Sequence, residues 1–505
     1  MKRDLTIYFT TDVHGYYSAM DYASGEREKT GLCGCLSAMK RDENTLLIDA
    51  GDILQGSPFM YWLNTSAKTE EFVPSRVMNI AGYDFVTIGN HDFNYGKENL
   101  ERYLREMNAR CVCANVTGVE GVEKTAVVTM KNGLRVGLTG IVTEFVNLWE
   151  KPENLVGVQV KEVVSAAKEA LEELKKEQVD VTVCIYHGGY EYDLDSGKLL
   201  SPTVENQACR ICSELDFDVL LTGHQHRALA DLCINGTYTC QPPDRARQFA
   251  AMYVQVEEDG RVSARSELIA AGEAHPEMAA YLAPLEAENA AYLDTPVGFL
   301  DTVLLPQEHL EMAVNGSLIA NFFNQVQLEA TGADISCTCL GNKVKGFENP
   351  RVTIRDIVST YVFPNTLVTL EVDRAVLKGA LERCGEYFDR DEEGKLTVGQ
   401  SFLYPMVEHY NFDHFLGIDV EMDLNRPMGD RVTSIRYQGE ELAEDRKLTL
   451  CVNNYRATGA GGYPMYPKCK VVKEQPTEIA ELIVAYVEKH RDITVVKDRW
   501  LHLLP

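Results

Sequence analysis

The chain has 505 residues, of which 45% are hydrophobic and 25% are charged, as in a globular protein. This length exceeds what one ordinary hydrophobic core accommodates, so we expect two or three domains. Aspartate and glutamate outnumber lysine and arginine by 76 to 49, which gives a net charge of −27. A body this acidic repels polymeric nucleic acid and acidic membrane surfaces, and it argues against a nuclease that acts on long chains.

The amino terminus shows no targeting signal, because Met1–Asp4 runs directly into the first predicted strand without the apolar segment of a leader. No stretch of about 20 apolar residues that could span a membrane occurs in the sequence. We therefore expect a cytoplasmic protein, the alternative being an exported protein whose leader is absent from this sequence. The 14 cysteines are expected to be reduced structural thiols.

Residues 1–270 alternate apolar strands with helical patterns, which predicts a layered α/β domain. An amphipathic helix between Lys161 and Gln178 leads directly into a strand over Val179–Tyr186. The segments Ala250–Glu257 and Arg261–Ser266 flank the turn Asp259-Gly260 and predict a hairpin that closes this domain.

An Ala- and Glu-rich stretch over residues 271–296 predicts a rigid connecting helix. Residues 297–505 then form a second domain, with a predicted helix over Gly316–Leu328 and predicted strands over Thr366–Val372 and Lys447–Asn453.

Residues of metal-ligand type follow five predicted strands of the first domain, each at the point where the apolar run ends. Open α/β sheets bind ligands beyond the carboxyl ends of their strands, so we expect these residues to form one shared metal site. A lone histidine after a strand is more often an ordinary satisfied polar residue than a ligand, and it is the five occurrences together that favour a metal site. The candidate ligands are Asp12, His14, Asp52, Asn90, His187, His224 and His226.

Seven ligands are too many for one ion, but two divalent ions that share Asp52 account for them. Imidazole and carboxylate ligands suit ions of the Mn, Zn or Fe type. Paired ions activate a bridging water and hold both oxygens of an in-line displacement, which is the chemistry of phosphoester hydrolysis. His91 lies next to Asn90 and is expected to stabilise charge on the phosphoryl group or to protonate the leaving oxygen. The proposed sets are Asp12, His14 and His226 on one ion, and Asn90, His187 and His224 on the other.

The motifs DxH, GD, GNHD, H and GHxH, in this order, resemble those of the calcineurin-like metallophosphoesterases. The longer segments Leu46–Pro58 and Gly89–Gly96 are similar to those of its 5′-nucleotidase and cyclic-nucleotide phosphodiesterase family. This resemblance implies a four-layer α/β/β/α sandwich, a connecting helix and a smaller α+β C-terminal domain that recognises nucleotide.

Two stretches of the second domain bear on the substrate. A Gly-rich loop over Asn453–Pro464 follows a predicted strand and contains Tyr455, and Tyr410 lies in a second aromatic segment. Taken alone, a tyrosine in such a loop is more often a core or turn residue. The family resemblance implies that Tyr410 and Tyr455 hold the base between their rings, a contact that does not depend on which base is bound. The full set of candidate substrate residues is Tyr410, Phe412, Asn453, Asn454, Tyr455 and Gly461.

Three departures from the 5′-nucleotidase pattern point to one branch of the family. Ala333–Leu340 lacks the expected phosphate-binding Arg, Tyr463 replaces the Asp of a GGDG signature, and Asn94 replaces the Asp that orients the catalytic histidine. With the segments Phe323–Ser336 and Phe363–Leu367, these features resemble 2′,3′-cyclic-nucleotide 2′-phosphodiesterase/3′-nucleotidases.

We therefore expect an enzyme with catalytic residues His91 and Asn94, acting on a small nucleotide. The alternatives are a 5′-nucleotidase or nucleotide-sugar hydrolase and, from another class, a nucleotide-binding protein that has lost catalysis. Nothing in the pattern specifies an oligomeric state.

Overall fold

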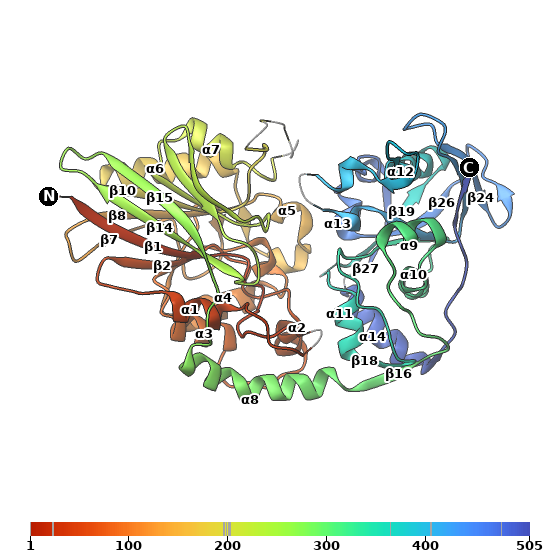
Figure 1. Ribbon diagram of the computed structural model, residues 1–505, viewed down its shortest axis with the longest axis horizontal. Helices are drawn as coiled ribbons and strands as arrows, with labels where there is room; N and C mark the ends of the chain where they lie inside the picture. The colour runs from red at the N-terminus through yellow and green to blue at the C-terminus, as the bar shows by residue number, and fades with distance from the viewer. Residues whose placement is uncertain are drawn as a thin grey trace. The chain divides into compact units, whose positions relative to one another are not determined.

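The computed structural model describes residues 2–22, 25–194, 197, 199, 204–363, 365–404, 407–475 and 477–504. The chain divides into two compact units, Met1–Ala290 and Ala291–Pro505 (Figure 1). Within the described residues, every helix is too short or too polar to cross a bilayer. Each unit has its own sheets and its own core, and the two are described separately.

The first unit contains two sheets that share one hydrophobic core. The first sheet has the strand order β15-β14-β1-β2-β3-β4-β6 and the second has the order β12-β13-β11-β10-β8-β7. Ile7 and Ile48 of the first sheet and Val183 and Leu221 of the second are buried in the same cluster. The neighbouring parallel strands are β1 (Arg3–Thr10), β2 (Thr45–Asp49), β3 (Phe85–Val86) and β4 (Arg110–Val112) in the first sheet, and β8 (Arg135–Val142), β10 (Val181–His187) and β11 (Val219–Thr222) in the second.

Helices cover the outer faces of both sheets. On the second sheet, Leu171 of α6 (Val163–Lys176) and Ile211 of α7 (Ala208–Glu214) pack with Cys184 of β10. The outer face of the first sheet is covered by the helices α1 (Leu32–Ala38), α3 (Val73–Ala81) and α4 (Lys97–Glu106) (Figure 1). The predicted four-layer α/β/β/α sandwich is confirmed.

The predicted hairpin is present as β14 (Gln248–Val256) and β15 (Val262–Ala270), which pair antiparallel along their length. The connecting helix is α8 (Pro276–Leu293), which begins five residues after the predicted start at 271. The difference arises because residues 271–275 bond to other segments of the first unit: the amides of Ala271 and His275 donate to the carbonyls of Arg247 (3.1 Å) and Cys33 (3.0 Å). Proline lacks an amide hydrogen and suits the first helical turn, so the helix starts at Pro276.

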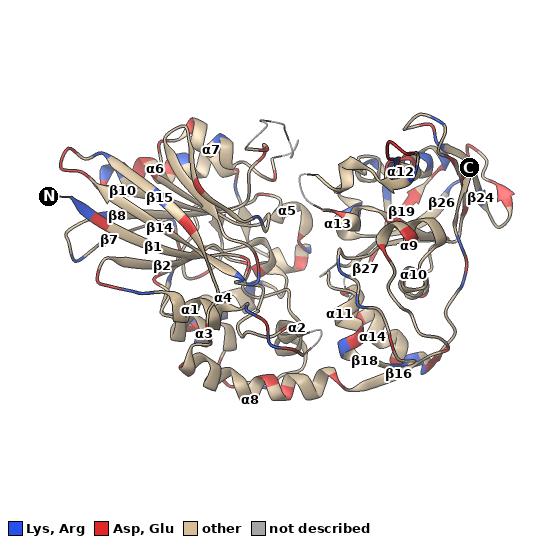
Figure 2. Ribbon diagram, in the orientation of Figure 1, with Lys and Arg blue, Asp and Glu red and all other residues tan. Residues whose placement is uncertain are grey.

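Acidic residues are spread over both units, and they include Glu277, Glu286 and Glu288 of α8 (Figure 2). This distribution is consistent with the net charge of −27.

The second unit is an α+β structure built around a five-stranded sheet of order β22-β17-β26-β19-β27. Its strands include β17 (Ile335–Cys339), β19 (Leu367–Val372), β22 (Asp413–Leu416) and β26 (Leu448–Asn453). Helix α10 (Leu318–Thr331) contacts β17 and β22. The helix predicted over Gly316–Leu328 therefore begins two residues later, because Ser317 accepts the amide of Ala320 and caps it.

Candidate active site

Three of the predicted ligands meet at the carboxyl ends of β1 and β11. Nε2 of His14 lies 3.1 Å from Nε2 of His226. Oδ1 of Asp12 lies 3.3 Å from Nε2 of His226 and 3.8 Å from Nε2 of His14. These three atoms surround one point, so Asp12, His14 and His226 form a group that could hold a metal ion.

A second group of ligand atoms adjoins the first. Nε2 of His187 lies 3.2 Å from Oδ2 of Asp52 and 3.0 Å from Oδ1 of Asn90. The same Oδ2 of Asp52 lies 3.8 Å from Nε2 of His14 in the first group. Asp52 therefore stands between the two groups, as a bridging ligand would.

His224 approaches the cluster differently. Its backbone amide donates to Oδ2 of Asp12 (2.9 Å), and its ring lies with its centroid 5.5 Å from that of His187. Nε2 of His224 lies 3.0 Å from Oε1 of Glu205, and the ring of Trp149 stacks on it. Glu205 thus holds the outer nitrogen and leaves Nδ1 as the ring atom available to a metal, a common arrangement for ligating histidines. Glu205 follows no motif, so sequence reasoning missed it.

Five of the candidate ligands have left-handed backbone conformations, with φ between 51° and 72°. Such conformations cost about 1–3 kcal/mol each for residues other than glycine, and they cluster at functional sites. The strain is maintained because these residues occupy short turns directly after buried strands. The five are Asp12, His14, Asp52, His224 and His226.

The turn that carries Asn90 and His91 is held by a buried carboxylate three residues after Gly89. Asp92 is 2% exposed and accepts the backbone amides of Gly89 (2.8 Å), Asp52 (2.9 Å), Ile53 (2.8 Å) and Leu54 (3.0 Å). One side chain therefore fixes the turns after β2 and β3 against each other. The sequence showed Asp92 inside the motif, but not what it binds.

The donor atoms fit divalent metal ions. Within the described residues, Oδ1 of Asp12 is buried without a hydrogen-bond partner, which is costly unless a cation faces it. Nδ1 of His14 lies 2.8 Å from the carbonyl oxygen of Gln55, and Nδ1 of His187 lies 2.7 Å from that of Ala50. Each Nδ1–H donates outward, so each Nε2 presents its lone pair to the cluster.

In the absence of metal, the pKa values of His14 and His187 are shifted in opposite directions. Burial lowers the pKa of His14 to about 4, although Asp52 attracts its charged form. For His187, burial is outweighed by the charge of Asp52 and the pKa rises to about 10. Metal binding requires neutral imidazole, so a proton shared by Asp52 and His187 must leave when an ion binds.

His91 stands beside the ligands. Its backbone amide donates to Oδ1 of Asp52 (2.8 Å), and its ring contacts that of His14 edge to face, with 5.5 Å between centroids. Nδ1 of His91 lies 2.8 Å from Oδ1 of Asn94, whose Nδ2 donates to Oε2 of Glu150 (2.6 Å). The predicted pair of His91 and Asn94 is therefore in direct contact, and Glu150 is an additional partner that the sequence did not reveal.

In the second unit, Tyr410 and Tyr455 are both partly exposed. The ring of Tyr410 contacts that of Phe363 edge to face at 6.2 Å between centroids. Tyr455 lies on the short helix α13 (Asn454–Ala457), which directly follows β26. The neighbouring Pro364, part of a segment that carried the family resemblance, lies outside the described residues.

Phe412 and Asn453 are both buried and make contacts within the second unit. Phe412 is 3% exposed, and its ring packs against those of Tyr387 (4.8 Å) and Phe388 (5.8 Å) in the core. Asn453 is 4% exposed and caps α13 by accepting the amide of Arg456 (2.6 Å). The sequence segment could not show which of its aromatic residues faces inward.

The two remaining candidates lie in the same loop region. Oδ1 of Asn454 accepts the amide of Thr366 (3.1 Å). Gly461 has φ 73°, and a Cβ there would lie 2.2 Å from Nη1 of Arg456, so only glycine fits.

A buried ion pair, also missed in the sequence, holds this region together. Arg456 and Asp413 are both 1% exposed, and Nη2 of Arg456 lies 2.9 Å from Oδ1 of Asp413. The guanidinium also donates to Oδ1 of Asn411 and to the carbonyls of Tyr410 and Ala460. The pair therefore joins the segment of Tyr410 to the glycine-rich loop.

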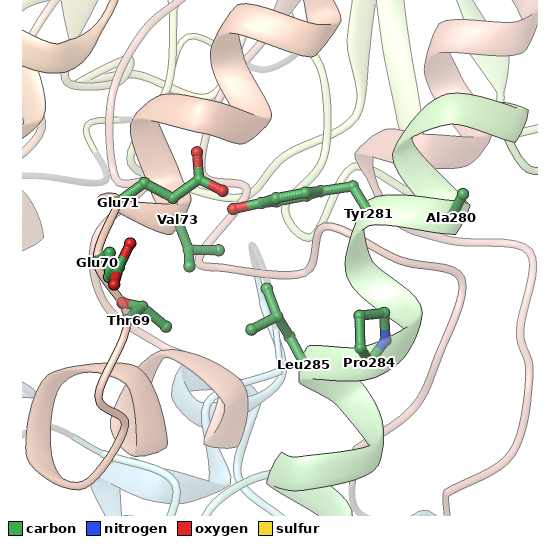
Figure 3. A pocket seen from close by; sticks show the side chains of 8 residues that line it. All are labelled: Thr69, Glu70, Glu71, Val73, Ala280, Tyr281, Pro284 and Leu285. Atoms are coloured by element: carbon green, nitrogen blue, oxygen red, sulfur yellow. The ribbon is translucent and has the colours of Figure 1, made fainter.

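A separate hollow of about 620 Å³ lies between α8 and the segment before α3 (Figure 3). None of the predicted ligand or substrate residues lines it, and it contains no histidine. The lining residues are Thr69, Glu70, Glu71, Val73, Ala280, Tyr281, Pro284 and Leu285.

Comparison with known proteins places the chain in a family. Residues 5–228 match the calcineurin-like phosphoesterases, and residues 296–468 match the 5′-nucleotidase C-terminal domain. A Haemophilus influenzae protein named 2′,3′-cyclic-nucleotide 2′-phosphodiesterase/3′-nucleotidase is 25% identical over 564 residues, covering 96% of this chain and 84% of that protein. The Bacillus subtilis trifunctional nucleotide phosphoesterase protein YfkN is 22% identical and covers 99% of this chain, which spans only 39% of that longer protein.

Among solved structures, a candidate 5′-nucleotidase from Staphylococcus aureus is 30% identical, with a TM-score of 0.89 and coverage of 99% of this chain and 100% of the other. This similarity extends over both units and agrees with the two matched families. The chain therefore belongs to the calcineurin-like phosphoesterases that carry a 5′-nucleotidase C-terminal domain, and it is a metal-dependent hydrolase of the nucleotidase and phosphodiesterase family.

Proposed function

We propose that the protein opens 2′,3′-cyclic nucleotides and then removes the 3′-phosphate of the product. The observation that carries this proposal is the contact between His91 and Asn94, at the position where 5′-nucleotidases are expected to have an aspartate. The segment expected to supply a phosphate-binding arginine supports it, since residues Ile335–Cys339 form the buried strand β17 without one. The Haemophilus relative named for these two activities matches 96% of the chain.

We further propose that two divalent ions occupy the ligand cluster, with Asp52 between them. When bound, such ions lower the pKa of a bridging water and stabilise the charge of an in-line displacement. The protein supplies fixed ligands whose outer nitrogens are held by carbonyls or by Glu205, which preserves their orientation. The proposed ligands are Asp12, His14 and His226 for one ion, and Asn90, His187 and His224 for the other.

His91 is the proposed proton donor to the leaving oxygen. Its backbone is held by Asp52, and its Nδ1 is engaged by Asn94, so Nε2 is the ring nitrogen left to meet substrate. A positioned acid of this kind contributes about 10²- to 10⁴-fold to the rate.

Tyr410 and Tyr455 are the proposed contacts to the base, because both are partly exposed. Stacking on aromatic rings tolerates any base. We propose small nucleotides as substrates, and the net charge of −27 supports this choice over nucleic acid polymers.

A 5′-nucleotidase or nucleotide-sugar hydrolase is the second candidate function. It is favoured by the similarity to the Staphylococcus aureus candidate 5′-nucleotidase, the relative with 30% identity over the full chain.

The test compares 2′,3′-cyclic AMP, 3′-AMP and 5′-AMP as substrates, with added Mn²⁺ and with EDTA, and follows products by chromatography. We expect Mn²⁺-dependent turnover of the first two, lost in His91→Ala and retained in His502→Ala, an exposed histidine outside the cluster. Turnover mainly of 5′-AMP would replace the proposal with the second candidate, and activity that survives EDTA would refute the metal assignment.

A further inference from the structure

Glu150 is bound by hydrogen-bond donors on both of its carboxylate oxygens. It directly follows the short helix α5 (Val146–Trp149), 56 residues from Asn94 in the chain. Oε2 accepts Nδ2 of Asn94 (2.6 Å), while Oε1 accepts the amide of Lys151 (2.7 Å) and Nδ2 of Asn154 (2.8 Å). The carboxylate is thus fixed in position and orientation.

This fixed carboxylate determines which way the Asn94 amide points. An ionised carboxylate can only accept hydrogen bonds, so the atom of Asn94 that faces Glu150 must be the NH₂ group. Oδ1 of Asn94 must then face His91, and an amide oxygen can only accept. Nδ1 of His91 is therefore the nitrogen that carries the proton in this contact.

The backbone of Asn94 is held as well, which keeps the residue next to His91 and Glu150. Its carbonyl accepts Nδ2 of Asn154 (2.9 Å), the same group that donates to Glu150. Its amide donates to the carbonyl of His91 (3.2 Å). Asn154 thereby links Glu150 and Asn94 directly.

We propose that Glu150 is a positioning residue that acts through Asn94 to keep the hydrogen on Nδ1 of His91, so that Nε2, which faces substrate, is the ring nitrogen that takes up a second proton and gives it to the leaving oxygen. This inference rests on the proposed role of His91. An aspartate at position 94 would accept from Nδ1 without help, whereas an asparagine alone presents either end of its amide. Glu150 removes this ambiguity and places the negative charge one residue farther from the imidazole.

The substitution Glu150→Gln is expected to reverse the whole series of hydrogen bonds. The Gln oxygen must remain with the two donors from Lys151 and Asn154, so its NH₂ group faces Asn94. The Asn94 amide then turns over and directs its own NH₂ group at Nδ1 of His91. This nitrogen becomes an acceptor, and the hydrogen moves to Nε2.

Nitrogen-15 NMR of the imidazoles in EDTA-treated full-length protein tests the tautomer without reference to activity. The His91 signals are identified by their loss in His91→Gln. We expect Nδ1–H in the wild type, Nε2–H in Glu150→Gln, and Nδ1–H again in Asn94→Asp/Glu150→Gln, where the introduced carboxylate accepts from both neighbours. An unchanged His91 tautomer in Glu150→Gln would overturn the proposal.

Kinetics provide the second readout. In Glu150→Gln, Nδ1 faces an NH₂ group and the ring cannot hold hydrogen on both nitrogens. We therefore expect kcat to fall at least about tenfold, as part of the 10²- to 10⁴-fold contribution of a positioned proton donor, and KM to change little. The double variant should recover to within about threefold of the wild type. Glu153→Gln is the matched control, because it removes the same charge from an exposed neighbour, and its kcat should not change. A double variant as slow as Glu150→Gln would also overturn the proposal.

The single variant Asn94→Asp distinguishes a loss of positioning from a general loss of folding. It places two carboxylates in the 2.6 Å contact that now joins an amide to a carboxylate, so we expect a lower Tm that Glu150→Gln restores. Additive effects of the two changes on Tm would refute the coupling. If the wild type turns over no nucleotide while the NMR result holds, the proposed function fails and the tautomer assignment stands.

Discussion

Two buried polar clusters in this protein look alike in sequence and differ in one physical respect. Both the ligand cluster of the first unit and the Arg456–Asp413 pair of the second contain charged residues. The ligands and Arg456 follow buried strands, whereas Asp413 is the first residue of β22. In the second, every N–H of the Arg456 guanidinium faces an acceptor of the protein itself. In the first, Oδ1 of Asp12 is buried and, within the described residues, accepts no hydrogen bond.

The difference teaches how to separate a binding site from a structural network. Buried polar groups are normally satisfied. Other buried atoms of the described residues also have no partner, but Asp12 differs from them because it lies in a group of carboxylates and imidazoles that could hold a metal ion. The arginine network is complete and stabilises a loop, whereas the aspartate cluster is completed only by a cation. The five left-handed residues in the ligand cluster reinforce the contrast, since neither Arg456 nor Asp413 has a left-handed backbone.

The largest expected effect is that of a substitution in the ligand cluster. Asp52→Asn removes the charge between the two groups of ligands, so we expect bound Mn²⁺ to fall from two ions per chain to one or fewer. Phosphoester turnover should drop about 10³-fold or more, because the ions supply several kcal/mol of transition-state stabilisation. Metal analysis after dialysis and kcat/KM measure both. Asp216→Asn, at a residue whose side chain is 93% exposed, is the control, and two bound ions in Asp52→Asn would contradict the bridging role.

Arg456→Leu tests the hydrogen-bond network around the Arg456–Asp413 pair. Removing one partner leaves the Asp413 carboxyl buried without its cation, which costs about 3–5 kcal/mol. Urea denaturation should show this loss, while the Mn²⁺ stoichiometry should not change. The double variant Arg456→Leu/Asp413→Leu should regain part of the stability, and a double variant less stable than the single one would contradict the account.

Tyr410→Ala and Tyr455→Ala distinguish substrate contacts from core residues in the second unit. Each loses a stacking surface worth about 1–3 kcal/mol, so KM should rise roughly 5- to 150-fold with little change in Tm. Phe412→Leu, at a buried ring, should show the reverse: a lower Tm with KM unchanged. An unaltered KM in both tyrosine variants would remove them from the substrate site.

The smallest expected effect is a loss of stability at low pH. His414 is 4% exposed, and burial lowers its pKa to about 3, aided by the charge of His309. Below about pH 6.5 the unfolded chain binds a proton that the folded chain rejects, so stability falls as the pH falls toward 3. At pH 5.5 the loss is about 1.4 kcal/mol. His414→Leu should flatten the pH dependence of Tm and His502→Leu should not; equal slopes in both variants would contradict the assignment.

Much of the fold and of the metal cluster follows from local sequence. The ligands occur where apolar runs end, and parallel strands of one sheet end at the same edge. Asp12 follows a strand of the first sheet and His187 ends a strand of the second, and the packing of the two sheets brings them together although 175 residues separate them. The positions of Tyr410 and Tyr455 required the family resemblance, because a tyrosine in a loop has no periodicity to interpret.

The partners of these residues could not be predicted. Glu150, Glu205 and Asp413 lie outside the motifs of the residues they contact, and only the tertiary structure brings each carboxylate to its partner. The burial of Phe412 was likewise not predictable, since its segment alternates too briefly to show which side chain faces the core.

The left-handed ligands also have an evolutionary consequence. A glycine at Asp12, Asp52 or His226 would relieve backbone strain while deleting a donor atom, so natural selection for folding alone favours loss of the site. In a lineage released from selection for turnover, we expect these positions to drift first, and toward glycine or asparagine. Their presence together in this chain is therefore what we expect if the proposed metal site is under selection.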